Sequence, residues 1–221
     1  MRIAAVPPSR RVWIFDLDNT LHDARPHIFP SMHAQMNAYL CRRFGVDEAG
    51  ADAMRRLFWE RYGTTLQGLV RHHGEDPRAF IRETHRFAEL DAMVVGEAAL
   101  RHALARLAGT RLVFSNAPRH YVEAVLSALG VARCFDAVYT IESTRYAPKP
   151  ALTGFRMLLR RHDLDARRCA LVDDMLENLR AAKQLGMSTV WVSAEHRRAP
   201  FVDLRIASVT ELPRRLARAA H

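Results

Sequence analysis

The chain has little cysteine, almost no lysine and no long hydrophobic run. Its three cysteines, Cys41, Cys134 and Cys169, are far apart and lack the spacing of a metal site, so we expect buried thiols in a reducing compartment. No stretch approaches the roughly 18 apolar residues that a membrane-spanning helix needs. Residues 1–11 also lack the apolar segment of a secretory leader. These absences predict a cytoplasmic protein with no membrane partner.

The scarcity of lysine makes the charge distribution informative. Lys149 and Lys183 are the only lysines, so nearly all of the net charge of +9 comes from arginine. The arginines are spread along the chain, with only short clusters near 160–161, 167–168 and 214–218. A nucleic-acid-binding protein usually gathers positive charge on one face or tail. The pattern argues against that class and fits attraction of a small anionic substrate.

The hydrophobic pattern predicts a globular α/β protein with a helical insertion. An apolar run beginning at Val12 indicates a buried strand, and 24–95 then contains amphipathic helical patterns without strands. Helices are expected there at 31–44, 48–62, 65–73 and 77–90. From 96 onward, strands near 111–114, 137–141, 169–172, 188–192 and 204–207 alternate with helices at 97–107, 119–129, 150–162, 176–185 and 211–219.

This alternation predicts a doubly wound parallel sheet, similar to a Rossmann fold. The expected domains are an α/β core made of 1–23 and 96–221, and an all-helical domain at 24–95.

Polar residues stand at four places beside the predicted strands and helices. They are Asp16 and Asp18 after the first strand, Ser115 and Asn116 after the second, Lys149 in a turn before a helix, and Asp173 with Asp174 after the strand at 169–172. Because the carboxyl ends of parallel strands meet at one edge, we expect these side chains to lie together. Taken singly, each has an ordinary explanation as a helix cap or a solvated turn residue.

Together, these residue types meet the demands of phosphoryl transfer. That reaction needs a nucleophile, an acid/base for the leaving group, and positive charge around the phosphoryl oxygens. Clustered carboxylates repel one another unless a hard cation lies among them, and Mg²⁺ prefers oxygen ligands. Lys149 stands out because the chain uses arginine almost everywhere else. A compact ammonium group beside a carboxylate is one reason for a lysine there.

In this order the motifs resemble those of the haloacid dehalogenase-like (HAD) hydrolase superfamily. The four matching segments are Asp16-x-Asp18-x-Thr20, Ser115-Asn116, Lys149-Pro150 and Asp173-Asp174. They fall within 12–178, and the helical block at 24–95 matches the position of the superfamily's type 1 cap domain. The resemblance implies that the cap closes over an active site at the edge of the sheet.

The resemblance also implies roles for the individual residues. Asp16 would attack phosphorus and become a phosphoaspartate, while Asp18 would protonate the leaving oxygen and then deprotonate water. Mg²⁺ would be held by Asp16, the backbone carbonyl of Asp18, and Asp173, with Asp174 orienting metal-bound water. The implied substrate-binding residues are Thr20, Ser115, Asn116 and Lys149. Dehalogenases of the superfamily lack an acid at the position of Asp18, so its presence predicts a phosphatase.

The cap segment at 62–69 resembles that of the pyrimidine 5′-nucleotidase branch, as do 15–21 and 173–179. The implied substrate is a nucleoside monophosphate such as UMP, CMP or a deoxy form. The same cap segment also fits an ordinary helix start punctuated by glycine. A phosphatase for a sugar phosphate or phosphoglycolate is the main alternative. A phosphorylatable receiver-like switch and a nucleic-acid-binding protein are others, and both a monomer and a homodimer remain open.

Overall fold

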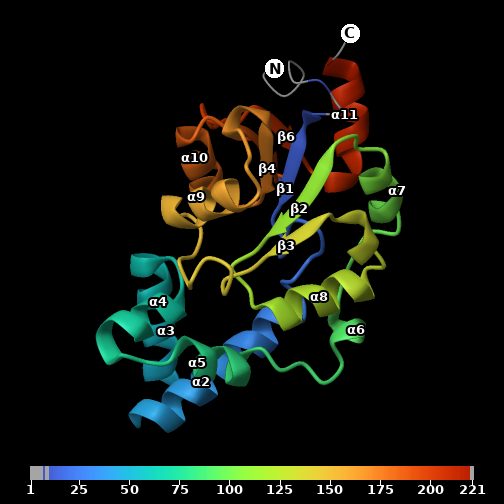
Figure 1. The fold of residues 1–221 in the computed structure, drawn as a ribbon. Helices are drawn as coiled ribbons and strands as arrows, with labels where there is room; N and C mark the ends of the chain where they lie inside the picture. Colours follow the sequence, from blue (N-terminus) through green and yellow to red (C-terminus); the bar gives the residue numbers. More distant parts are fainter. Residues whose placement is uncertain (1–6, 8–9, 220–221) are drawn as a thin grey trace.

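The computed structural model describes residue 7 and residues 10–219, and its centre is a six-stranded parallel sheet (Figure 1). In spatial order the strands are β3 (Ala137–Tyr139), β2 (Thr110–Phe114), β1 (Val12–Phe15), β4 (Cys169–Asp173), β5 (Ser188–Val192) and β6 (Leu204–Ile206). All neighbouring pairs are parallel. The predicted doubly wound α/β fold is therefore confirmed, with β1 between β2 and β4.

Helices cover both faces of the sheet because its side chains alternate between two apolar cores. Val12 and Ile14 enter one buried cluster, whereas Trp13 and Phe15 enter the other. The helices packed on the Ile14 side are α9 (Leu152–Arg161) and α10 (Leu176–Gln184), and those on the Phe15 side are α7 (Leu100–Ala105), α8 (Arg119–Ala128) and α11 (Leu212–Ala219). Short 3₁₀ turns lie at η2 (Ala132–Cys134), η3 (Ala166–Arg168) and η4 (Val209–Glu211).

Of the six helices that the structure describes between β1 and β2, four lie beyond the carboxyl ends of the strands (Figure 1). They are α2 (Ile28–Phe44), α3 (Glu48–Tyr62), α4 (Thr65–His73) and α5 (Pro77–Thr84), and we call them the helical insertion. They bury a cluster of their own around Leu40, Leu69 and Phe80. The chain leaves and returns at one place, because the N–H of Asp23 donates to the carbonyl of Val95 at 2.8 Å.

The prediction of a helix at 77–90 is wrong at the C-terminal boundary. The observed α5 stops at Thr84, and α6 (Leu90–Met93) is a separate short helix. Tertiary contacts use the backbone groups that would extend α5: the N–H of Arg86 donates to the side chain of Gln35, and the carbonyl of His85 bonds the ring of His120. Helices α7 and α9 are also shorter than predicted. Within the described residues, no helix combines the length and hydropathy needed to cross a membrane.

Candidate active site

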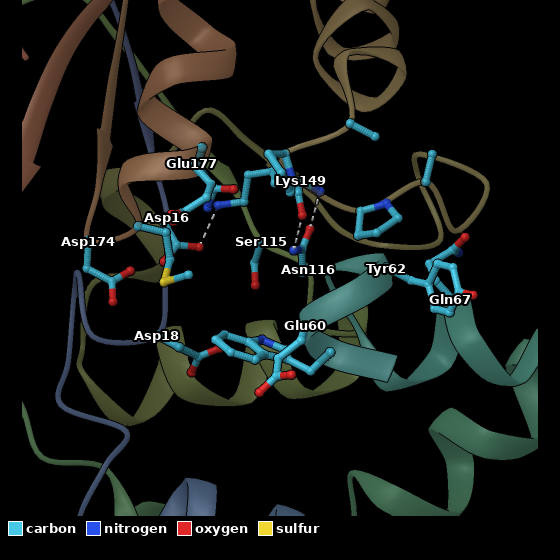
Figure 2. A pocket seen from close by; sticks show the side chains of 18 of the residues that line it. Asp16, Asp18, Glu60, Tyr62, Gln67, Ser115, Asn116, Lys149, Asp174 and Glu177 are labelled. Carbon is cyan, nitrogen blue, oxygen red and sulfur yellow. Dashed lines mark hydrogen bonds and ion pairs between the residues drawn. The ribbon is translucent and has the colours of Figure 1, made fainter. Parts of the chain in front are cut away.

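The ends of two adjacent strands bring the predicted carboxylates together. Asp16 directly follows β1, and Asp173 and Asp174 stand at the end of neighbouring β4. One carboxylate oxygen from each of the three residues lies within 4.8 Å of the others. Figure 2 shows Asp16 and Asp174 facing a common cavity beside Lys149. The expected meeting of these side chains at one edge of the sheet is what the fold produces.

Lys149 joins two of these carboxylates from a loop between β3 and α9. Its buried Nζ lies 2.7 Å from Oδ1 of Asp16 and 2.8 Å from Oδ2 of Asp173. Asn116 holds this loop in place: its amide donates to the Lys149 carbonyl at 3.0 Å and accepts from the Lys149 N–H at 2.7 Å. Burial works to lower the pKa of Lys149, but the charges of Asp16 and Asp173 raise it above its ordinary value. Lys149 is therefore cationic.

The carboxylate cluster carries more negative charge than one ammonium group balances. Burial, which outweighs the charge of Lys149, raises the pKa of Asp16 well above its usual range. Burial and the charge of Asp173 raise the pKa of Asp174 to about 7. Both shifts show that ionising these carboxyls is unfavourable in this setting. A divalent cation with a preference for oxygen ligands would relieve that repulsion, so the donor set fits Mg²⁺.

Asp173 is the most completely bonded of the three carboxylates. Its Oδ1 accepts from the N–H of Met175 at 2.9 Å, and Asn178 donates to Oδ1 and Oδ2 at 2.9 and 3.1 Å. With Lys149 on Oδ2, each oxygen accepts from two donors. Asn178 was not among the predicted site residues. Its position in the first turn of α10, five residues after Asp173, was the available signal.

Asp18 lies apart from this cluster and has different partners. Its Oδ1 accepts from the hydroxyl of Tyr121 at 2.6 Å and lies 2.9 Å from Nε2 of His22. Burial and the charge of Asp18 raise the pKa of Tyr121, so the phenol stays protonated. Neither Tyr121 nor His22 was predicted. Tyr121 lies on a helix 103 residues away in the chain, and no local pattern indicates that contact.

The two predicted hydroxyl residues differ in their exposure to the cavity. Ser115 lines it, and its Oγ accepts from the N–H of Ala117 at 3.0 Å, so the hydroxyl hydrogen can point to a ligand. Thr20 is buried behind Asp16, with its Oγ1 3.4 Å from Oδ2 of that residue. Among the described residues that line the cavity, Thr20 is absent. Its contact is with the nucleophile candidate and not with the cavity.

A cavity of about 930 Å³ separates these residues from the helical insertion. Figure 2 shows Glu60 and Tyr62 of α3 across from Asp16 and Lys149. A second cavity of about 550 Å³ adjoins the first and extends between α2, α3 and α4. Residues shared by both linings are Asp18, Phe29, Trp59, Gly63 and Asn116. The combined space therefore runs from the carboxylate cluster past Asp18 into the helical insertion.

The cap segment singled out at 62–69 has both structural and site-facing residues. Gly63 ends α3 with a φ of 81°, and Thr64 caps α4 by accepting from the N–H of Gln67 at 3.2 Å. Gly68 gives room to the ring of Phe58. Tyr62 and Gln67 line the first cavity, and the amide of Gln67 donates to a backbone carbonyl of the core, at residue 146. The turn is thus held against the core at the cavity's edge.

Comparison with known proteins agrees with this geometry. The family model of haloacid dehalogenase-like hydrolases matches residues 11–186. The chain is 24% identical to Phosphate metabolism protein 8 of Saccharomyces cerevisiae over 200 residues, which is 83% of this chain and 61% of that protein. It thus spans less than two thirds of that relative's length.

Two solved structures share the fold across almost the whole chain. An HAD phosphatase from Thermococcus onnurineus matches with a TM-score of 0.66 and 20% identity, covering 93% of this chain and 97% of that one. CbbY from Rhodobacter sphaeroides, in complex with phosphate, matches with a TM-score of 0.66 and 21% identity, covering 91% and 96%. With its family model matched over most of its length, and with that family's fold, the chain belongs to the haloacid dehalogenase-like hydrolases.

Proposed function

We propose that the protein is a phosphomonoester hydrolase that works through a phosphoaspartate on Asp16. The observation that carries this proposal is the bridge from Lys149 to Asp16 and Asp173, with Asp18 at the wall of the same cavity. This arrangement supplies a carboxylate nucleophile, a cation beside it, and a separate carboxyl for proton transfer. The proposed reaction also explains why one buried lysine holds two buried aspartates.

The proposed reaction has two displacements. In the first, an oxygen of Asp16 bonds to phosphorus, the bond from phosphorus to the leaving oxygen breaks, and Asp18 gives that oxygen a proton. In the second, water attacks the phosphorus of the phosphoaspartate, its proton passes to Asp18, and the bond to Asp16 breaks. Lys149 and the hydroxyl of Ser115 would hold phosphoryl oxygens throughout. Asn116 contributes by fixing the backbone of Lys149.

Asp16, Asp174 and the backbone carbonyl of Asp18 would hold the metal. When bound, Mg²⁺ supplies charge neutralisation and orientation for the phosphoryl group. The hydrogen bonds favour Asp174 over Asp173 as the direct ligand, since both oxygens of Asp173 already accept from two donors. This reverses the order of the two residues that the family resemblance implied. Asp173 would then act by holding Lys149 and Asn178.

We propose a pyrimidine 5′-mononucleotide as the substrate. With phosphorus at Asp16 and the leaving oxygen at Asp18, the leaving group extends into the second cavity. That cavity contains the aromatic side chains of Phe29 and Trp59, and Trp59 is 53% exposed. An exposed indole beside a phosphate site is suited to stacking on a nucleobase. The resemblance of the cap segment at 62–69 supports the pyrimidine choice, and a sugar phosphate or phosphoglycolate remains the alternative.

We further propose that 24–95 moves as a cap over the core formed by 1–23 and 96–221. The paired backbone of Asp23 and Val95 supports this division, because both connections between the two parts pass through one place. The two connecting segments, which lie side by side at Asp23 and Val95, would form the hinge. The contact of Gln67 with the core at residue 146 would be made when the cap is closed.

Replacing Asp16 by asparagine tests the reaction. Asp16→Asn removes the nucleophile while keeping its shape, so Mg²⁺-dependent phosphate release should fall by about a thousandfold or more. The measurement is a phosphate-release screen over UMP, CMP, sugar phosphates and phosphoglycolate, with and without Mg²⁺. Circular dichroism and thermal unfolding report whether the variant is folded.

The exposed Asp91 of α6 provides the matched control, because Asp91→Asn makes the same change away from the cavity. That variant should keep wild-type activity. Appreciable Mg²⁺-dependent hydrolysis by Asp16→Asn would contradict the mechanism. A higher kcat/KM for sugar phosphates or phosphoglycolate than for UMP and CMP would contradict the choice of substrate alone.

A further inference from the structure

The carboxyl group of Asp18 is held from one side only. Its Oδ1 accepts from the Tyr121 hydroxyl at 2.6 Å and contacts Nε2 of His22 at 2.9 Å. The side chain of Asp18 is 21% exposed, whereas that of His22 is 0% exposed and Tyr121 is buried. Oδ1 therefore points into the protein. The accessible part of the carboxyl group faces the cavity that Asp18 lines.

The surroundings of the two ring nitrogens of His22 indicate which of them carries the hydrogen. Nδ1 of His22 is buried and has no hydrogen-bond partner among the described residues. A hydrogen on Nδ1 would therefore be a buried donor without an acceptor, which is the less tolerated kind of unpaired group. A hydrogen on Nε2 instead meets Oδ1 of Asp18. Since a phenol donates at neutral pH, both neighbours of Oδ1 are donors.

We propose that Tyr121 and His22 are positioning residues that fix Oδ1 of Asp18, so that Oδ2 is the oxygen that exchanges the proton. The inference rests on the proposed phosphatase reaction. The proton leaves Oδ2 for the leaving oxygen as the bond from phosphorus to that oxygen breaks and the bond from phosphorus to Asp16 forms. Oδ2 regains a proton from water as the water oxygen bonds to phosphorus and Asp16 departs.

The two donors approach from independent parts of the fold, which makes the orientation firm. Tyr121 belongs to α8 in the core. The centroid of its ring lies 5.4 Å from the ring centroid of Phe87 and 6.1 Å from that of His85. His22 lies in the turn after β1, four residues beyond Asp18. A carboxyl group held by two anchored donors loses the rotations that would turn its proton away from the substrate.

The test is the dependence of the rate on the leaving group. Tyr121→Phe removes only the hydroxyl, so the acid is held less well. For alkyl phosphates, whose leaving oxygen must be protonated, kcat/KM should fall by about ten- to a hundredfold, a part of what general acid catalysis contributes. For 4-nitrophenyl phosphate, whose leaving group departs without a proton, it should fall by less than about twofold. The ratio kcat/KM is used because it reports only the steps up to departure of the leaving group.

Matched variants separate positioning from stability. Tyr139→Phe removes a hydroxyl from another buried core tyrosine and should leave both kcat/KM values unchanged. His22→Gln retains an N–H donor and should remain closer to wild type with alkyl phosphates than His22→Leu. Equal losses with alkyl and nitrophenyl phosphates, or no loss, would overturn the positioning role. A wild-type protein that hydrolyses no phosphomonoester would instead overturn the proposed function.

Discussion

At the scale of single residues, Asp173 and Asp174 are adjacent in the chain yet have opposite surroundings. Asp173 is fully buried and accepts from Lys149, Asn178 and the backbone of Met175. Asp174 faces the cavity, and its pKa is raised to about 7 by burial and the charge of Asp173. The sequence shows two aspartates after a strand, but only the tertiary contacts distinguish them. The order of the roles that we propose for them was therefore not predictable.

The other site residues also differ in whether the sequence alone could identify them. Asp16, Ser115 and Lys149 could be found from the sequence because each follows a strand or precedes a helix of a parallel sheet. Tyr121 and His22 could not, since their importance comes from a contact with Asp18 that no local pattern encodes.

Trp59 provides the first test at this scale. If the exposed indole stacks on a nucleobase, Trp59→Ala should raise KM for UMP about tenfold, which corresponds to about 1.4 kcal/mol and lies within the range for loss of one base stack. Inhibition by inorganic phosphate should be unchanged, because in the proposed site phosphate would contact Asp16 and Lys149 and would not reach the indole. Steady-state kinetics and product inhibition measure both quantities.

Leu57 is the matched control for Trp59. It lies on the same helix, is also 53% exposed, and is not among the described residues that line either cavity. Leu57→Ala should leave KM for UMP unchanged. If Trp59→Ala weakens phosphate binding as much as it weakens UMP binding, the indole does not act on the base.

At the scale of elements, the contact between α3 and α4 sets the shape of the helical insertion. Gly68 lies so close to Phe58 that a β-carbon on Gly68 would stand 2.1 Å from Cγ of the ring. Gly68→Ala should therefore destabilise the protein by about 1–3 kcal/mol, despite the better helix propensity of alanine. Urea unfolding measures the change.

A second variant makes this prediction specific. Replacing the ring by the smaller side chain in Phe58→Leu should lower the free energy of unfolding less in the Gly68→Ala background than in the wild type. The reason is that the smaller side chain relieves the overlap. Additive effects of the two substitutions would show that the overlap is not the cause.

Most elements could be predicted because strand and helix periods differ clearly. The strands of the core are short apolar runs, and glycines such as Gly45 and Gly63 end α2 and α3 in left-handed conformations. The largest departure was in the chain beyond Thr84. There the helical pattern continues, but contacts with Gln35 and His120 take the backbone groups that a longer helix would need.

At the scale of the whole molecule, the metal binding proposed for the acidic cluster would be linked to stability. Mg²⁺ bound to the folded state should raise the free energy of unfolding by about 2.7 kcal/mol at a concentration one hundred times its Kd. Asp174→Asn should abolish this gain because it removes the proposed direct ligand. It should also stabilise the metal-free protein, since it removes a buried carboxyl whose pKa is raised.

Thermal unfolding with EDTA and with excess Mg²⁺ measures both effects. Asp91→Asn should respond like the wild type, which separates the site from general effects of charge. An Mg²⁺-dependent rise in Tm that survives in Asp174→Asn would place the metal elsewhere.

The strand order has a consequence for the protein as it is synthesised. β1 is translated first but lies between β2 and β4, so one of its two neighbours is made much later. While the ribosome has not yet released β4, Trp13 and Phe15 lie in a strand with an open edge, and Asp16 has neither Asp173 nor Asp174 beside it. A nascent chain at that stage is a candidate for chaperone binding. The proposed active site can form only after Asp173 and Asp174 have been translated, well after Asp16.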